Sequence, residues 1–314
     1  VGRVPVSPVE IVRILASSLL GLDGDAGSPL SRMVLLEIRL PRVVAAVLIG
    51  AGLSASGAAY QGVFRNPLVS PDILGVSAGA GLGAAIAILL SLPTVGIQLL
   101  SFVFALLAVG VSSAIGLRCQ QHRSGILGLI LGGIVVGSVF TSFLSLSKLV
   151  ADPENKLPAI TFWLMGSLAA VTPRDLLVLA LPMLVAGVVL FRVRWYINVL
   201  SFGDDEARSL GADVRRVRAI VVLASTVMTA CAISVCGIVG WIGLMAPHIS
   251  RMLVGPNYRI LLPTSLLVGG GVLVLVDDLA RSLTTTEVPL GILTSLIGGP
   301  FFVWLMLRSA RQWD

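Results

Sequence analysis

The most highly charged stretch of the chain runs from Gly203 to Arg216 and mixes carboxylates with arginines. A short polar helix that ends at a glycine, here Gly211, forms a rigid surface element suited to contact with another protein. The alternative is a solvated loop whose arginines only set the orientation of the chain in a membrane. Either reading makes this stretch a binding or orienting element and not a catalytic one.

Three further arginines lie far from that stretch, namely Arg39, Arg42 and Arg281. A guanidinium group binds a carboxylate through two parallel hydrogen bonds, so these side chains suit an interface with an acidic partner. A local alternative exists for Arg281, because Asp277 and Asp278 precede it by four and three residues. On a helix such neighbours share a face and form ion pairs.

The sequence offers little for catalysis. Its only lysines are Lys148 and Lys156, and neither stands in the G-x-x-x-x-G-K-[ST] pattern of a phosphate-binding loop. The apolar segments hold no paired acids or histidine clusters, and His248 has no carboxylate three or four residues away. The cysteines lack metal-ligand spacing. We therefore expect no catalytic residue and no metal site, which argues against an intramembrane enzyme.

The elements that position these residues are apolar helices. Hydrophobic residues make up 56% of the 314, and charged residues only 12%, against about 25% in soluble domains. So few polar groups cannot cover a soluble enzyme, and long continuous apolar runs argue against a β-barrel. We predict an all-α polytopic membrane bundle, one domain over residues 1–314. Apolar segments of the kind that spans a membrane lie at 41–63, 73–92, 94–117, 125–149, 173–192, 217–237, 240–254, 260–282 and 289–307, of which the seventh is short for a span.

Loop charge predicts the orientation of the bundle, because cytoplasmic loops carry an excess of Arg and Lys. Thirteen of the 22 basic residues fall on the side of the densest cluster. Nine spans with the C-terminus on that side place Val1 outside, which predicts one further helix before this sequence. The inside set is Arg65, Arg118, Arg123, Arg192, Arg194, Arg208, Arg215, Arg216, Arg218, Arg251, Arg259, Arg308 and Arg311.

Small residues indicate how the helices pack. Gly75, Gly79 and Gly83 recur every four residues and so share one helix face, where they let another backbone approach closely in lipid. The alternative is that they line a pore. A capping hydroxyl, a first-turn proline and an early acid predict helix starts at Ser70–Asp72 and Thr172–Asp175.

Three stretches together resemble a known family. They occur in an order and spacing that resemble the FecCD-type (BtuC-like) permeases, the membrane subunits of ATP-binding-cassette (ABC) importers for iron-siderophores, haem and cobalamin. The resemblance covers about residues 4–308. The stretches are Arg39–Arg42 with Gln61–Gly75, then Gly240–Arg251, then Asp277–Arg281 with Glu287–Thr294 and Gly298–Phe302.

The resemblance implies the transmembrane fold of type II ABC importers, which has ten helices. The first of these is absent from this chain, and residues 1–38 would be a periplasmic segment before the first visible span. Residues 200–217 would form the cytoplasmic coupling loop, two short helices joined at a glycine that sit in a groove of the ATPase.

The resemblance also implies site residues. Arg39, Arg42 and Arg281 match family arginines that face acidic residues on a periplasmic binding protein. Ser124, Gly125, Ile126 and Leu127 match the region of the cytoplasmic gate. The residues that match the coupling site are Asp205, Glu206, Ala207, Arg208, Leu210, Gly211 and Ala212.

The function implied is that of a homodimeric importer permease in the bacterial inner membrane. Two ATPase subunits would hold ATP and Mg, and this chain would bind no cofactor and no nucleic acid. The expected cargo is an iron-siderophore or haem, with cobalamin or a molybdate-type oxyanion as alternatives. A different class, an ion-coupled secondary transporter, would need ionisable groups at mid-membrane, and the helix centres are almost bare of charge.

Overall fold

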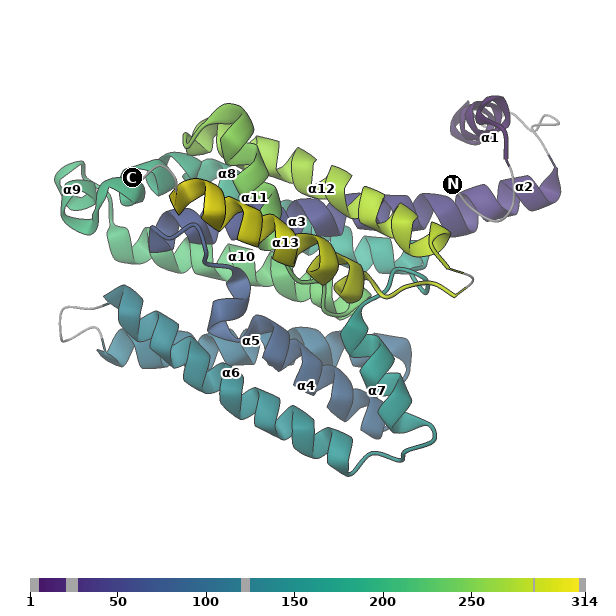
Figure 1. Cartoon of the computed structure of the whole chain (residues 1–314), viewed down its shortest axis with the longest axis horizontal. Helices are drawn as coiled ribbons and strands as arrows, with labels where there is room; N and C mark the ends of the chain where they lie inside the picture. Colours follow the sequence, from purple (N-terminus) through teal and green to yellow (C-terminus); the bar gives the residue numbers. More distant parts are fainter. Residues whose placement is uncertain (1–5, 21–27, 120–124, 285, 311–314) are drawn as a thin grey trace.

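A computed structural model of the chain describes residues 6–20, 28–119, 125–284 and 286–310. Those residues form helices joined by short loops, with no strand among them (Figure 1). Two short segments are not α-helical: η1 is a π-helical stretch that joins α2 to α3, and η2 is a 3-10 turn. The bounds are α1 Pro8–Leu20, α2 Pro29–Met33, η1 Val34–Arg39, α3 Leu40–Phe64, η2 Pro71–Leu74, α4 Val76–Leu89, α5 Thr94–Cys119, α6 Gly125–Leu149, α7 Lys156–Met165, α8 Pro173–Phe202, α9 Asp204–Ser209, α10 Val214–Cys236, α11 Ile242–Val254, α12 Tyr258–Ser282 and α13 Leu290–Ala310.

The predicted all-α membrane bundle is confirmed. Each of the nine apolar segments coincides with a helix, and six described helices are long and apolar enough to cross a membrane. These six are α5, α6, α8, α10, α12 and α13. The 25-residue helix α3 lies at the centre of the bundle, with nearly all of its second half buried.

Two predicted spans are too short to cross the bilayer alone. At 1.5 Å per residue, the 14 residues of α4 extend only about 21 Å, against a hydrocarbon core of about 30 Å. The reason is Gly75, whose φ of +84° breaks the helix between η2 and α4. Ser70 and Pro71 therefore start a 3-10 turn and not the predicted helix. The 13-residue helix α11 is short in the same way and ends at Gly255, which also has positive φ.

The predicted span at 173–192 is longer in the structure. Thr172 and Asp175 form the capping box that the sequence indicates, and α8 continues for 30 residues to Phe202. Arg192 and Arg194 therefore lie in the helix and not in a loop. The ten-residue helix α7 was not predicted, because its apolar run is too short to register as a span.

The helices form two groups, seen one above the other in Figure 1. The first contains α4, α5, α6 and α7, and the second surrounds α3 with α8, α10, α11 and α12. Backbones approach closely wherever glycines meet. A Cβ added at Gly57 would lie 1.7 Å from the carbonyl oxygen of Gly243, and one at Gly50 would lie 2.3 Å from that of Gly269. In lipid such contact replaces the hydrophobic drive between helices.

The glycines of α4 have this packing role. A Cβ at Gly79 would lie 2.4 Å from the carbonyl oxygen of Phe104, and one at Gly83 would lie 2.3 Å from that of Leu100. Both carbonyls belong to α5. The structure therefore favours helix packing over pore lining for these two glycines.

Gly57→Ala is expected to destabilise the protein by about 1–3 kcal/mol, because its methyl group would overlap the backbone of α11. Gly271→Ala on α12 is the matched control, since a Cβ there meets nothing within 4 Å. The measurement is the midpoint of thermal unfolding in detergent for both variants. Equal midpoints for the two would mean that α3 and α11 do not cross at Gly57.

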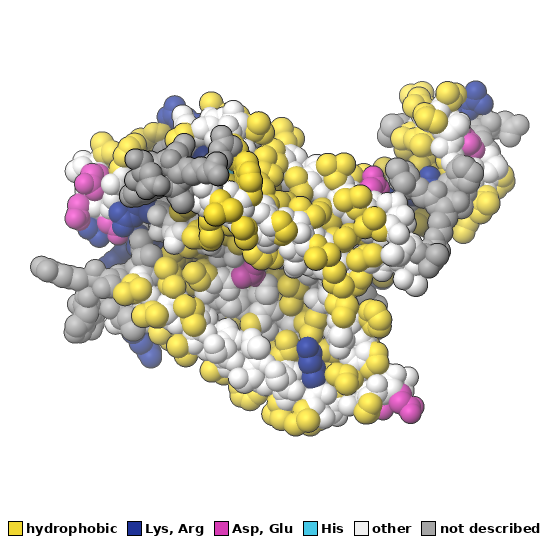
Figure 2. All heavy atoms as spheres, in the orientation of Figure 1, with side chains coloured by type: hydrophobic (Ala, Val, Ile, Leu, Met, Phe, Trp, Pro, Cys, Tyr) yellow, Lys and Arg dark blue, Asp and Glu magenta, His cyan; other side chains and the backbone are white. Residues whose placement is uncertain are grey.

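The charged residues lie mainly at the two ends of the long axis, and apolar side chains cover much of the face between them (Figure 2). Arg65 follows the end of α3 and lies beside α9, whereas Arg42 lies in the first turn of α3, near the end of α12. The length of α3 therefore separates the arginines that the sequence assigns to opposite sides. The long helices run roughly along the long axis of the molecule (Figure 1), so this is the axis that would cross a membrane.

Candidate functional site

The loop between α8 and α10 folds around one short helix, α9. Gly203, with φ of +138°, ends α8 and lets the chain turn into α9, whose first turn carries Asp204, Asp205 and Glu206. Negative charge at this position is stabilised by the helix dipole. Gly211, with φ of +81°, then reverses the chain, and the amide of Ala212 donates to the carbonyl of Ala207 over 2.9 Å.

The expectation of two short helices joined at a glycine is wrong for this chain. After Gly211 only Ala212 and Asp213 precede α10, which begins at Val214. The Asp213 carboxylate caps that helix by accepting from the amide of Arg216 at 3.1 Å. The long helix α10 thus takes the place of the second short helix, so α9 is held rigidly at its end.

Ion pairs fix α9 to the bundle. The Asp204 carboxylate accepts from Nη2 of Arg218 at 3.0 and 3.1 Å, and Nη2 of Arg65 lies 3.9 Å from it. Arg218 is buried in α10, and Arg65 follows α3. Ala207, on the inner side of α9, is fully buried. The short helix is therefore linked to the two helices at the centre of the bundle.

The outer face of α9 is open to a partner. Leu210 at the end of α9 is 61% exposed, and the Asp205–Arg208 ion pair beside it is exposed as well. A polar hollow of about 810 Å³ lies between α9 and the start of α10, lined among others by Glu206 and Arg215. An exposed leucine next to a charged hollow forms a surface suited to binding a second protein.

Asp204→Asn is expected to loosen α9 while leaving the bundle folded, because it removes the charge that Arg218 and Arg65 contact. Amide hydrogen exchange over residues 204–212 should rise about tenfold, which corresponds to the loss of roughly 1.4 kcal/mol. Asp205→Asn is the control, because the Asp205 side chain is 92% exposed and pairs only within α9. Equal exchange in the two variants would contradict the anchoring role of Asp204.

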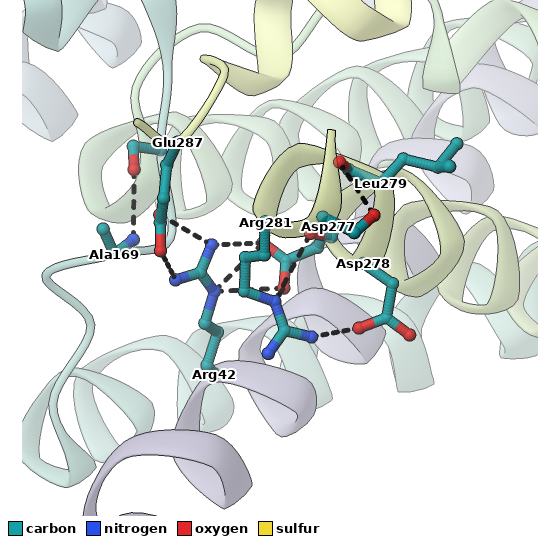
Figure 3. A network of polar contacts seen from close by, with 9 residues as sticks. Arg42, Ala169, Asp277, Asp278, Leu279, Arg281 and Glu287 are labelled. Atoms are coloured by element: carbon teal, nitrogen blue, oxygen red, sulfur yellow. Dashed lines mark hydrogen bonds and ion pairs between the residues drawn. The ribbon is translucent and has the colours of Figure 1, made fainter. Parts of the chain in front are cut away.

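A buried charge network occupies the opposite end of the molecule (Figure 3). Arg42 of α3 donates from Nε and Nη2 to the Asp277 carboxylate over 2.8–3.1 Å. Its Nη1 and Nη2 also donate to Glu287, over 2.9 and 3.0 Å. The side chains of Arg42 and Asp277 are only 8% and 2% exposed. One guanidinium thereby joins α3, α12 and the segment that leads into α13.

Arg281 extends this network on α12. Its Nε lies 3.3 Å from Asp277, and its Nη2 contacts Asp278 (Figure 3). The spacing of four and three residues is the local pairing that the sequence left open. Asp277 therefore receives two arginines, one from its own helix and one from α3.

These contacts correct part of the docking prediction. Arg42 is not presented at the surface, because its side chain is buried and its donors face Asp277 and Glu287 of the same chain. The side chain of Arg281 is only 13% exposed. Glu287 was missed as a partner of Arg42, since 245 residues separate the two and no spacing rule links them. Arg39 lies half-buried at the end of η1, one turn before Arg42.

The predicted gate region lies at the start of α6. Ser124 is outside the described residues, and Gly125 and Ile126 are the first residues of the helix. The side chain of Leu127 is 54% exposed. The start of α6 lies at the same end of the molecule as α9 (Figure 1).

Comparison with known proteins identifies the family. The profile of the FecCD transport family matches residues 1–308. The chain belongs to the FecCD transport family. The resemblance found in the sequence is confirmed, and this FecCD protein is a permease subunit of the ABC importer class.

Relatives of this FecCD permease carry several names. The molybdate import system permease protein MolB of Haemophilus influenzae is 38% identical over 311 residues, covering 99% of this chain and 91% of that protein. A probable iron chelatin transport system permease protein of Helicobacter pylori is 40% identical over 277 residues, covering 88% and 83%. The hemin transport system permease protein HmuU of Yersinia pestis is 38% identical over 284 residues, covering 88% and 84%.

A solved structure confirms the fold of this FecCD permease. It is described as an inward-facing conformation of a metal-chelate type ABC transporter and matches with a TM-score of 0.84 at 36% identity. The match covers 95% of this chain and 97% of the other. The predicted membrane-domain architecture is therefore present here.

Proposed function

We propose that this permease carries a metal chelate from the periplasm to the cytoplasm across a bacterial inner membrane. The names of its relatives support this cargo class, since they include an iron chelatin and a hemin permease. An iron-siderophore or haem is the first choice. Cobalamin and a molybdate-type oxyanion remain the alternatives, supported by the relatives that carry those names.

ATP would be bound and hydrolysed, with Mg, in two separate ATPase subunits, and this chain would hold no cofactor. The observation that carries this proposal is α9, a short rigid helix with an exposed leucine, fixed by Asp204 to the two central helices. Such an element transmits the movement of a bound partner to α3 and α10. Asp205, Glu206, Ala207, Arg208, Leu210, Gly211 and Ala212 make up the proposed contact site and its support.

The permease would work as a homodimer with the pathway between its two copies. The exposed face of α6 supports this arrangement, because it carries a stripe of hydroxyls at Ser138, Thr141, Ser142 and Ser145. The hydroxyls of Ser138, Ser142 and Ser145 donate to backbone carbonyls one turn earlier. Polar side chains on a membrane helix favour a facing protein or a water-filled path over lipid.

A periplasmic binding protein would dock at the end that holds Arg39 and Arg281. Because Arg42 is buried there, its proposed contribution is to hold the docking surface in shape. The gate would lie at the opposite end, near residues 124–127.

Uptake of ⁵⁵Fe-siderophore into proteoliposomes that contain the assembled importer tests the proposal. We expect uptake to need internal ATP and to stop when the ATPase is replaced by a hydrolysis-deficient variant. Dissipating the proton gradient with an uncoupler should have little effect. Uptake that survives loss of the ATPase and collapses with the uncoupler would instead identify an ion-coupled secondary transporter.

A further inference from the structure

One carboxylate lies well inside the membrane-spanning part of the protein. Asp72 belongs to η2, the turn between the end of α3 and the start of α4. A small cavity beside it is lined by Leu53 of α3 and Thr229 of α10. Leu53 lies thirteen residues into α3, about 20 Å along its axis. Asp72 is therefore near the middle of a hydrocarbon core that is about 30 Å thick.

The Asp72 side chain is accessible and has no cationic partner among the described residues. It is exposed to solvent, although its neighbours on either side along the chain are buried or half-buried. Hydroxyls of Ser77 and Ser70 donate to its carboxylate. None of the ion pairs between described residues includes Asp72.

A second polar group points to the same place. Thr229 is 2% exposed, its hydroxyl has no hydrogen-bond partner among the described residues, and it lines the same cavity of about 20 Å³. That volume holds a single water molecule or one polar atom of a ligand. A buried hydroxyl without a partner is costly in a low-dielectric site, so the cavity is built for a polar occupant.

The backbone around this cavity is also unusual. Trp241, which lines it, has a φ of +68°, a conformation that side chains other than glycine rarely adopt. Its side chain packs against Gly298 and Phe302 of α13. The strained residue thus connects the surroundings of Asp72 to α13, and strain of this kind clusters at functional sites.

Lipid cannot be the environment of this carboxylate. Ionisable side chains at mid-membrane depth face a bundle interior or a water-filled cavity, because hydrocarbon does not solvate their charge. In a single copy Asp72 is open on one side, so water between two copies of the chain would supply its solvation.

We propose that the Asp72 carboxylates of the two copies face the translocation pathway at mid-membrane and select cargo by charge. The pathway would favour cationic or neutral chelates and disfavour anions such as molybdate. This inference rests on the homodimeric importer proposed above. It adds a specificity-determining residue and favours one substrate class over the others.

The size of the effect follows from Coulomb's law. One unit charge at about 8 Å in a hydrated cavity raises the local concentration of a monovalent cation about threefold and lowers that of a monovalent anion by a similar factor, so the cation-to-anion ratio changes roughly five- to tenfold. Two copies of Asp72 act on the same path, so the effect on a permeating ion is at least as large as that of one.

Cysteine labelling measures this field directly. The probes are a cationic and an anionic methanethiosulfonate reagent, applied to the assembled complex in proteoliposomes. The reporter is Leu244→Cys, at a half-buried position that lines the same cavity. The background is Cys119→Ser, because Cys231 and Cys236 are buried. Asp72→Cys serves as a second reporter of access in case the first fails to fold.

We expect Leu244→Cys to react with both reagents, and Asp72→Asn to lower the cation-to-anion ratio of the rates five- to tenfold. Glu154→Gln, the same change of charge at an exposed loop, should leave the ratio unchanged. The inference is overturned if neither reporter reacts with aqueous reagents, or if Asp72→Asn does not change the ratio.

Transport is measured in parallel so that the two proposals can fail separately. Suppose that the complex shows no ATP-driven uptake but that Asp72→Asn still lowers the cation-to-anion ratio of labelling rates. This result contradicts the importer proposal and supports the placement of Asp72 in a water-filled pathway. If the complex transports normally but Asp72→Asn leaves the cation-to-anion ratio of labelling rates unchanged, only the charge selection is contradicted.

Discussion

Asp277→Asn is expected to lower the stability of the folded permease by about 3–5 kcal/mol. The substitution leaves Arg42 buried with only Glu287 to balance it, and the Arg42 side chain is just 8% exposed. The loss is large because the partner charge disappears while the desolvated guanidinium stays inside the protein. Thermal unfolding in detergent, followed by intrinsic tryptophan fluorescence, measures the change.

Asp278→Asn is the matched control. Asp278 is the next residue on the same helix, but its side chain is 34% exposed, and among the described residues it forms an ion pair with Arg281 alone. Loss of such a partly exposed pair should cost no more than about 1 kcal/mol. Similar losses in Asp277→Asn and Asp278→Asn would show that the buried pair with Arg42 does not hold α3 to α12.

A double variant separates charge burial from packing. Replacing both partners, with Arg42→Met and Asp277→Leu, removes the two buried charges together. Its stability should exceed that of either single variant, because neither charge is left without its partner. The remaining acid, Glu287, is 38% exposed and can be hydrated. A double variant less stable than both single variants would contradict this explanation.

Leu210→Asp is expected to weaken binding of the ATPase subunit about 10- to 100-fold. The Leu210 side chain is 61% exposed at the end of α9, so the substitution should not disturb the fold of the permease. A carboxylate placed at the apolar centre of an interface would be desolvated without a partner, and such central positions carry most of the binding energy.

The affinity of the ATPase for the detergent-solubilised permease, measured by biolayer interferometry, checks this prediction. Leu283→Asp is the control, since Leu283 is 58% exposed just after α12, at the opposite end of the molecule. It should leave ATPase binding unchanged. If both variants bind the ATPase as the wild type does, Leu210 is not part of the interface.

Composition and apolar runs were sufficient to predict the bundle and the place of its nine apolar segments. They could not predict where helices break inside an apolar run. Gly75 interrupts the run at 73–92 through its positive φ, and residues around it form a turn. Capping chemistry is local and was predicted well at Thr172, where the hydroxyl, the proline and Asp175 lie within four residues.

The candidate site could be predicted only as far as local spacing reaches. Asp277 and Asp278 beside Arg281 were visible as possible partners, and the structure has these pairs. The bonds from Arg42 to Asp277 and Glu287 cross more than 230 residues of sequence, so spacing could not reveal them. An arginine whose match suggested a surface role therefore proved to be buried.

The depth of Asp72 in the membrane also could not be predicted from the sequence. In the sequence it was an early acid at a helix start, outside the centres of the apolar runs. In the structure the chain turns back after Arg65, and η2 packs against α6, where a Cβ at Gly133 would meet the carbonyl oxygen of Ile73 at 2.0 Å. A loop residue thus reaches mid-membrane depth, which hydropathy along the chain does not detect.

The sidedness of ATP and binding protein tests the central claim most directly. Proteoliposomes with the complex in a known orientation would receive ATP on one side and substrate-loaded binding protein on the other. We predict uptake only when ATP is on the side of α9 and the binding protein is on the side of Arg39 and Arg281. Uptake without ATP, or with ATP supplied only on the side of Arg39, would contradict the account.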